Sequence, residues 1–253
     1  MQIRHKNREI YFREQTECTQ KYVIPYIEQV LCIKSNLRVL EIGCGEGGNL
    51  KPFLDVGCHC VGIDIDVAQL EKAKAFFANH SLNKNLRLIA NDIYKVSPNE
   101  IGNFDLIILR DVIEHLPNQE LFMHQLKCFM HSESVVFFGF PVWCNPFGGH
   151  QQICRNKWLS HTPWLHLLPN RLYKKALQLG GESASTIKAL LDIKATGISL
   201  SRFESILHKE QYQILKHTHY FINPNYEIKF SLRPRIIPQY LQIPYLLDFY
   251  TTS

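Results

Sequence analysis

Short apolar runs that end at turn-forming residues recur through the first part of the chain and predict a parallel sheet. Segments with helical spacing lie between the runs; residues 67–79, for example, place Leu70, Ala73, Phe76 and Phe77 on one face. Strands and helices that alternate in this way are typical of an α/β fold whose ligand crevice lies at the carboxyl ends of the strands. The predicted strands are residues 38–42, 58–64, 86–90, 104–109 and 134–140.

The chain departs from this alternation after the fifth predicted strand. Residues 141–152, PVWCNPFGGHQQ, combine helix breakers with aromatic residues, and residues 156–180 have leucine and aromatic residues at helical spacing. We therefore expect a helical lid that begins where the fifth strand reaches the crevice. The expected parts of a single domain are 1–35 (N-terminal helices), 36–140 (core), 141–185 (lid), 186–232 (a helix at 198–208 and strands at 212–220 and 226–232) and 233–253 (irregular tail).

The glycine-rich stretch GCGEGG, residues 43–48, follows the first predicted strand directly. Glycine reaches positive φ at low cost and has no Cβ, so such a turn lets a ligand approach the backbone closely. Gly43, Gly45 and Gly48 fit the G-x-G-x-x-G pattern of dinucleotide sites, with Asp64 at a suitable distance for a ribose. However, Glu41 in the strand and Glu46 in the turn would place carboxylates beside an anionic pyrophosphate, which favours a cationic ligand such as S-adenosylmethionine.

The segment from Glu41 to Gly47 resembles the first motif of the class I S-adenosylmethionine-dependent methyltransferases. That motif is E-x-G-x-G-x-G, and Glu41, Gly43, Gly45 and Gly47 match it. The resemblance implies a Rossmann-like, seven-stranded, mostly parallel sheet with an antiparallel last strand and helices on both faces. It also implies the site: acids at successive strand ends hold the ribose and the adenine, and the backbone after the fourth strand faces the methionine part. The expected cofactor-binding residues are Glu41, Gly43, Cys44, Gly45, Gly47, Asp64, Ile65, Asp92, Ile93, Leu109 and Arg110.

Residues 110–117, RDVIEHLP, resemble the segment after the fourth strand of small-molecule methyltransferases of the quinone-biosynthesis type. This resemblance implies methyl transfer to an oxygen, nitrogen or carbon nucleophile of a small metabolite. If the acceptor is a hydroxyl, a base has to lie within hydrogen-bond reach of it, and His115 and His150 are the two candidates. Each histidine could instead order its own loop. Asp111, Trp143 and Gln151 are expected to contact the acceptor.

Eight cysteines are scattered without a C-x-x-C pair, which favours reduced thiols. Cys144, His150, Cys154 and His161 suggest a zinc site, but their spacings fit no standard ligand pattern, and we predict no metal.

The chain has a net charge of +5 spread along its 253 residues and no apolar run as long as about eighteen residues. Its polar first residues are unlike a signal peptide. We therefore expect a cytoplasmic protein that acts on a small-molecule acceptor, has no transmembrane segment and does not bind nucleic acid. A homodimer could form through the lid.

Two other functions remain open from the sequence. A nicotinamide-dependent oxidoreductase fits the glycines but leaves Glu41, Glu46 and Asp92 without a role. A noncatalytic protein could retain the cofactor pocket and bind a partner. An RNA methyltransferase is disfavoured, because no N-P-P-Y or D-P-P-Y sequence follows the fourth predicted strand.

Overall fold

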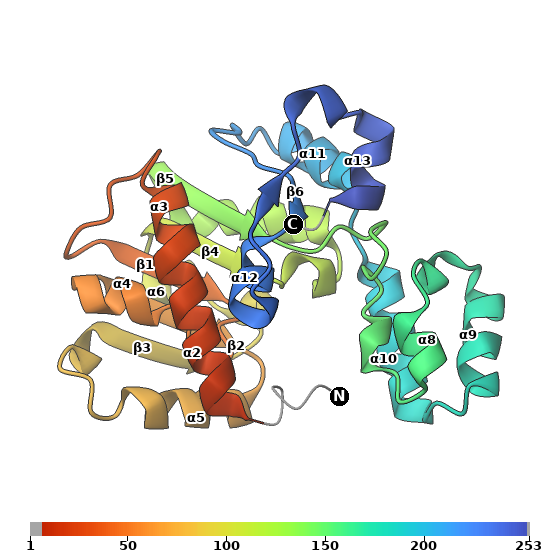
Figure 1. Cartoon of the computed structure of the whole chain (residues 1–253). Helices are drawn as coiled ribbons and strands as arrows, with labels where there is room; N and C mark the ends of the chain where they lie inside the picture. Colours follow the sequence, from red (N-terminus) through yellow and green to blue (C-terminus); the bar gives the residue numbers. More distant parts are fainter. Residues whose placement is uncertain (1–6, 252–253) are drawn as a thin grey trace.

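A parallel sheet of five strands is the centre of the structure, a computed structural model that describes residues 7–251 (Figure 1). The strands lie in the order β3-β2-β1-β4-β5, so the chain reverses direction across the sheet between β1 and β4. Ligands of open α/β sheets bind at such a switch point, at the carboxyl ends of the strands. The strands are β1 (Arg38–Ile42), β2 (His59–Asp64), β3 (Leu86–Ala90), β4 (Phe104–Arg110) and β5 (Met130–Gly139).

Both faces of the sheet are buried, as the nearly continuous apolar strands predict. Strand β4 shows this most clearly: Leu106 and Ile108 pack into the cluster on one face, and Ile107 and Leu109 pack into the cluster on the other. The first cluster is covered by α3 (Ile24–Ile27), α4 (Lys51–Val56) and α5 (Val67–Phe77), and the second by α6 (Pro98–Ile101), α7 (Gln119–Leu126) and α11 (Leu200–Lys209). All five predicted core strands are confirmed, with small changes at their ends.

The N-terminal helices run across the carboxyl ends of the strands (Figure 1). Helix α2 (Arg8–Cys18) continues through a π-helical turn (Thr19–Val23) into α3, with Pro25 near its start, where a missing backbone N–H costs least. The helices expected within residues 1–35 therefore form one continuous run from Arg8 to Ile27. Short 3-10 turns occur at Asn83–Asn85, Ile93–Lys95, Ile113–His115, Lys127–Phe129, Gln151–Ile153, Leu165–Leu167 and Gln239–Leu241.

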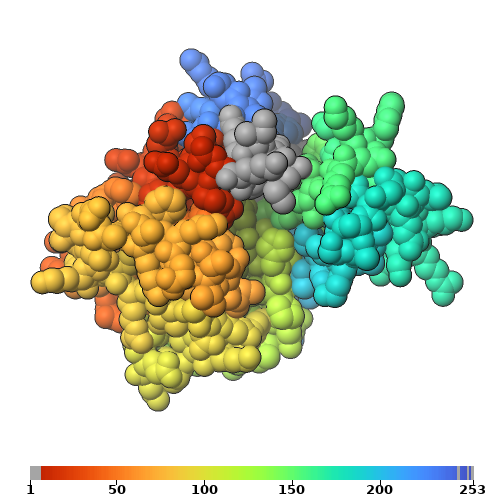
Figure 2. Space-filling model, turned by 90° about the horizontal axis from the view of Figure 1, so that it is seen from below, coloured from red at the N-terminus to blue at the C-terminus, as the bar shows by residue number. Residues whose placement is uncertain are grey.

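A helical lobe, residues 151–196, projects from the sheet (Figures 1 and 2). Its main helices are α8 (Lys157–His161), α9 (Asn170–Leu179) and α10 (Ala184–Thr196). They enclose a small apolar cluster of their own, formed by Cys154, Tyr173, Leu177, Ile187 and Leu190. The expected helical insertion after the fifth strand is present, but it extends past residue 185 because α10 supplies part of this cluster. Its role as a lid stays a prediction.

The prediction of seven strands in one sheet is wrong. In the part of the chain that is described, β5 pairs only with β4, and β6 (Tyr220–Ile222) pairs with β7 (Arg235–Ile236) in a separate antiparallel ribbon. Residues 212–219, expected as a strand, are irregular. They pass the free edge of β5 and enclose a cavity of about 810 Å³ beside it.

The expected seventh strand, residues 226–232, is mostly helix α12 (Pro224–Phe230). Pro224 occupies the first helical position, where it favours a helix, and Tyr226 and Phe230 stack edge to face one turn apart, with ring centroids 5.6 Å apart. Apolar residues two and four apart fit a strand and one helical turn equally well in so short a segment. The last helix is α13 (Pro244–Tyr250).

Because the helical lobe has its own cluster, we expect it to lose structure separately from the sheet. Leu177→Ala removes a fully buried side chain from that cluster and should lower the free energy of local unfolding by about 2–5 kcal/mol. Hydrogen exchange should show faster exchange across residues 151–196, while β1 and β4 stay protected. Leu179→Ala on the exposed side of α9 is the control, and equal loss of protection in the sheet would contradict a separate unit.

Candidate functional site

The glycine loop between β1 and α4 has the backbone that its sequence predicts. Gly43, Gly45 and Gly47 have φ angles of 70°, 52° and 79°. A Cβ at Gly43 would lie 2.4 Å from a methyl carbon of Val112, so only glycine fits there. The amide of Gly45 donates to a carboxylate oxygen of Asp64 over 2.7 Å, and Asp64 thereby holds the loop against the end of β2.

Glu41 is buried at the end of β1, and its carboxyl group has one satisfied oxygen. Oε1 accepts a hydrogen bond of 2.7 Å from the side-chain amide of Asn49, whereas Oε2 has no partner among the described residues. Burial raises the pKa of Glu41 to about 8, although Asn49 and Arg110 lower it. A buried oxygen without a partner fits a ligand that brings a donor or a positive charge to this place.

Arg110 joins four segments around the same point. Its guanidinium donates to the side-chain oxygens of Asn49 (2.7 Å), Thr19 (2.9 Å) and Asn225 (2.8 Å). It therefore ties the end of β4 to the glycine loop, to the N-terminal helices and to α12. The sequence predicted a backbone role for Arg110 and missed this one, because Thr19 and Asn225 are distant in the chain.

Helices α2 and α12 cover the end of the crevice where the methionine part of the cofactor is expected. They lie side by side above the carboxyl end of β4. A cavity of about 20 Å³ lies beneath them, lined by residues that include Tyr11, Asn49 and Arg110. A small-molecule site needs roughly 300 Å³ or more. The cavity of about 810 Å³ beside β5 also reaches Arg110, Asp111 and Asn225, so a space of that size meets the end of β4 from the β5 side.

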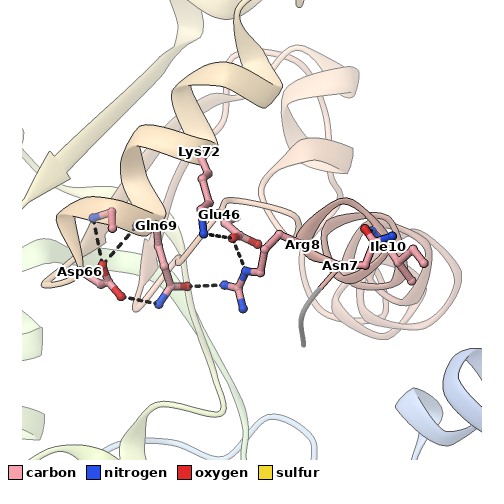
Figure 3. A network of polar contacts seen from close by, with 8 residues as sticks. Asn7, Arg8, Ile10, Glu46, Asp66, Gln69 and Lys72 are labelled. Atoms are coloured by element: carbon pink, nitrogen blue, oxygen red, sulfur yellow. Dashed lines mark hydrogen bonds and ion pairs between the residues drawn. The ribbon is translucent and has the colours of Figure 1, made fainter. Parts of the chain in front are cut away.

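Glu46 does not offer a free charge to a ligand, so this part of the sequence argument is wrong. It is buried and forms an ion pair of 2.5 Å with Arg8, with Lys72 at 4.0 Å (Figure 3). Arg8 also donates to Gln69, whose side-chain amide donates to Asp66, the N-cap of α5. These contacts fasten α2 to the glycine loop and to α5.

The adenine and ribose half of the crevice is more open. Ile65 follows β2 with 76% of its surface exposed, next to Asp64. Asp92 follows β3 and accepts a hydrogen bond of 3.1 Å from the amide of Tyr94, which fixes the turn that contains the buried Ile93. The cofactor-binding roles of Ile65, Asp92 and Ile93 stay predictions. Cys44 and Leu109, two further expected cofactor-binding residues, are buried.

Two histidines and a carboxyl group meet beyond the end of β4. The rings of His115 and His150 stack edge to face with centroids 5.1 Å apart, and His115 Nε2 lies 3.7 Å from a carboxyl oxygen of Glu114. Burial lowers the pKa of His115 to about 4, and it also lowers the pKa of His150. Burial and the nearby Asp111 raise the pKa of Glu114. Both imidazoles are therefore neutral at pH 7 and able to accept a proton.

Glu114 is buried beside these two histidines. One atom from each of Glu114, His115 and His150 lies within 4.8 Å of the others, close enough to hold a metal ion. This is the only such group among residues 7–251, and it differs from the zinc set that the sequence suggests. Cys154 instead packs in the helical lobe, and His161 contacts the Lys157 carbonyl.

Trp143 and Gln151 support the loop after β5. Trp143 packs against His166, with ring centroids 4.6 Å apart, and its carbonyl oxygen lies 2.7 Å from His166 Nε2. Gln151 is fully buried, and its side-chain amide donates to the carbonyl oxygens of Pro146 and Thr162. Asp111 is exposed, with a positive φ of 55°, and lines the cavity beside β5.

A family model described as a methyltransferase domain matches residues 12–179. The chain belongs to this family. It is therefore an S-adenosylmethionine-dependent methyltransferase. The glycine loop and the acids at the strand ends agree with this assignment. The nicotinamide-dependent alternative is not supported.

Curated relatives of the methyltransferase include ubiquinone biosynthesis O-methyltransferases. The protein of Bartonella tribocorum is 26% identical over 192 residues, which cover 67% of this chain and 76% of that protein. The protein of Brucella melitensis biotype 2 is 26% identical over 125 residues, which cover 45% and 49%.

Solved methyltransferases share the fold. The plantazolicin methyltransferase BpumL in complex with S-adenosylhomocysteine superposes with a TM-score of 0.51 at 18% identity, over 81% of this chain and 66% of that one. The related BamL complex gives 0.51 at 14% identity, over 82% and 65%. The chain spans about two thirds of the length of these solved structures. Within residues 7–251, no helix of the methyltransferase combines the length and the apolar character needed to span a membrane.

The raised pKa of Glu41 predicts how stability depends on pH. Between its ordinary pKa of 4.5 and about 8, folded Glu41 holds a proton that the unfolded chain has released. Stability should therefore fall as the pH rises through this window. Glu41→Gln keeps an acceptor for Asn49 and removes the titration, so its free energy of unfolding should fall less across the window. Urea unfolding at several pH values measures the free energy of unfolding of each variant. Glu71→Gln, on the exposed side of α5, is the control. Parallel pH profiles for Glu41→Gln and the parent would contradict the prediction.

Proposed function

We propose that the chain transfers a methyl group from S-adenosylmethionine to an oxygen of a small acceptor held beside His115 and His150. The pair of neutral, partly buried histidines beyond the end of β4 carries the proposal. The curated relatives support oxygen as the receiving atom, since both are named O-methyltransferases.

The residues that would hold the cofactor follow the strand ends. The glycine loop and Glu41 would meet the amino acid part, and Asp64 would bind the ribose. Ile65, Asp92 and Ile93 would surround the adenine. The bound cofactor supplies an activated methyl group on a sulfonium, so the protein has to align the acceptor and exclude water. The unpartnered oxygen of Glu41 and the exposed side chain of Ile65 fit these roles.

His150 is our choice for the base. It follows Gly148 and Gly149, has a positive φ of 55°, and so is held by its loop in a backbone conformation that few non-glycine residues adopt. The ring of His115 supports its ring from the side, and the Glu114 carboxyl group lies behind His115. His150 would accept the hydroxyl proton as the acceptor oxygen attacks the methyl group, and His115 would keep the ring of His150 in place.

Replacement of the two histidines should separate these roles. His150→Gln should lower kcat by about 10²–10⁴-fold, because the proton acceptor is lost, and leave cofactor affinity unchanged. His115→Gln should lower kcat less. Release of S-adenosylhomocysteine with a panel of phenolic acceptors measures the rate, and calorimetry measures cofactor binding. Parent-like kcat in His150→Gln would refute the base, and cofactor binding without turnover of any acceptor would favour the noncatalytic alternative.

A divalent cation at Glu114, His115 and His150 is the second candidate for the same cluster, because their ligand atoms converge. One carboxylate and two imidazoles suit Zn²⁺. A bound cation would polarise the acceptor hydroxyl. In that case a chelator should abolish turnover of the parent while cofactor binding persists, and Glu114→Gln should weaken Zn²⁺ binding measured by calorimetry. Full activity in the presence of chelator would leave the histidine base as the explanation.

A further inference from the structure

The helical lobe differs in charge from the rest of the chain. The last part of the lobe, residues 182–196, is balanced, with Glu182 and Asp192 against Lys188 and Lys194, whereas residues 141–181 contain no aspartate or glutamate. They contain five lysines or arginines, all exposed: Arg155, Lys157, Arg171, Lys174 and Lys175. Because the whole chain has a net charge of only +5, the lobe carries a concentrated positive surface on a molecule that is otherwise nearly balanced.

Helix α9 mixes these cations with exposed leucines on one side. Tyr173 and Leu177, four residues apart, face the core of the lobe and are fully buried. At 100° per residue, the opposite side of the helix carries Arg171, Lys175 and two leucines. Those leucines, Leu172 and Leu179, are 55% and 80% exposed.

An exposed tryptophan lies at the same corner of the lobe. Trp158 in α8 is 87% exposed. The side-chain amide of Asn156, the N-cap of α8, donates to the carbonyl oxygen of Gly180 over 3.0 Å, and Leu159 packs against Gly180. The start of α8 is thus fixed at the end of α9, so Trp158 and Leu179 emerge next to this junction.

We propose that this surface, formed by Trp158, Leu172, Leu179 and the five cations, binds an anionic lipid surface. Lysine and arginine attract the headgroups of anionic lipids, and tryptophan and leucine gain free energy when they enter the boundary between headgroups and acyl chains. The charge of the lobe favours this occupant over a second copy of the chain, because two such lobes would repel each other. The leucines favour it over a nucleic acid, since phosphates and bases give an aliphatic side chain little to contact.

Vesicle binding of the full chain tests the proposal. We expect sedimentation with vesicles of phosphatidylcholine and phosphatidylglycerol and little with phosphatidylcholine alone, with binding that weakens as salt is added. Arg171→Gln with Lys175→Gln should weaken binding about thirty-fold, because each cation near an anionic membrane strengthens binding by roughly fivefold. Lys34→Gln with Lys84→Gln removes the same charge from the core and should bind like the parent.

A second pair of variants tests the apolar contribution to vesicle binding. Trp158→Ala should weaken vesicle binding, whereas Tyr240→Ala, which removes an equally exposed aromatic ring from the tail, should not. Cofactor binding, measured in parallel, should stay unchanged in every variant, which separates this proposal from the proposed reaction. Equal binding to neutral vesicles, no binding to anionic ones, or equal losses in the control pairs would overturn the proposal. So would RNA binding or self-association that the lobe variants abolish while vesicle binding is absent.

Discussion

The structure depends on one buried hydrogen-bond network at the carboxyl ends of β1 and β4. Asn49 is its centre: its amide nitrogen donates to Glu41, and its oxygen accepts from both Arg110 and Thr19. A buried guanidinium has to be surrounded by acceptors, because an unpaired one would cost several kcal/mol. Arg110 obtains those acceptors from segments far apart in the sequence, and this requirement fixes where α2 and α12 lie.

That constraint gives the crevice two unlike halves. On the adenine side, Ile65 is exposed and Asp64 is half-buried at the end of β2. On the methionine side, α2 is attached at both of its ends, through Arg8 to Glu46 and through Thr19 to Asn49. Asn49 supplies Glu41 with a hydrogen bond, and Arg110 supplies a nearby positive charge. A positively charged ligand at Glu41 would replace part of this stabilisation. The contacts that hold α2 and those that a ligand at Glu41 would meet therefore share the side chain of Asn49.

The sequence predicted what depends on neighbours in the chain. The five core strands and the glycine turn follow from local spacing. What it missed depends on distant partners. Arg8 neutralises Glu46 across 38 residues, so counting both acids as free charges at the loop was wrong although the conclusion about the cofactor class was right. The segment at 226–232 failed for another reason: seven residues are too few for the apolar pattern to separate a strand from a helix.

The acceptor side of the molecule is built on a different principle from the cofactor side. His115 follows β4 directly, but His150 reaches it from a loop whose shape is set by the helical lobe. A Cβ on Gly149 would lie 2.1 Å from the side chain of His166, and His166 in turn contacts Trp143 and receives a hydrogen bond from Lys194 of α10 on its carbonyl oxygen. The distance between the two histidine rings is therefore a property of how the lobe sits on the sheet. Sequence variation in the lobe can reshape the acceptor site in this way while the glycine loop and the strand ends stay as they are.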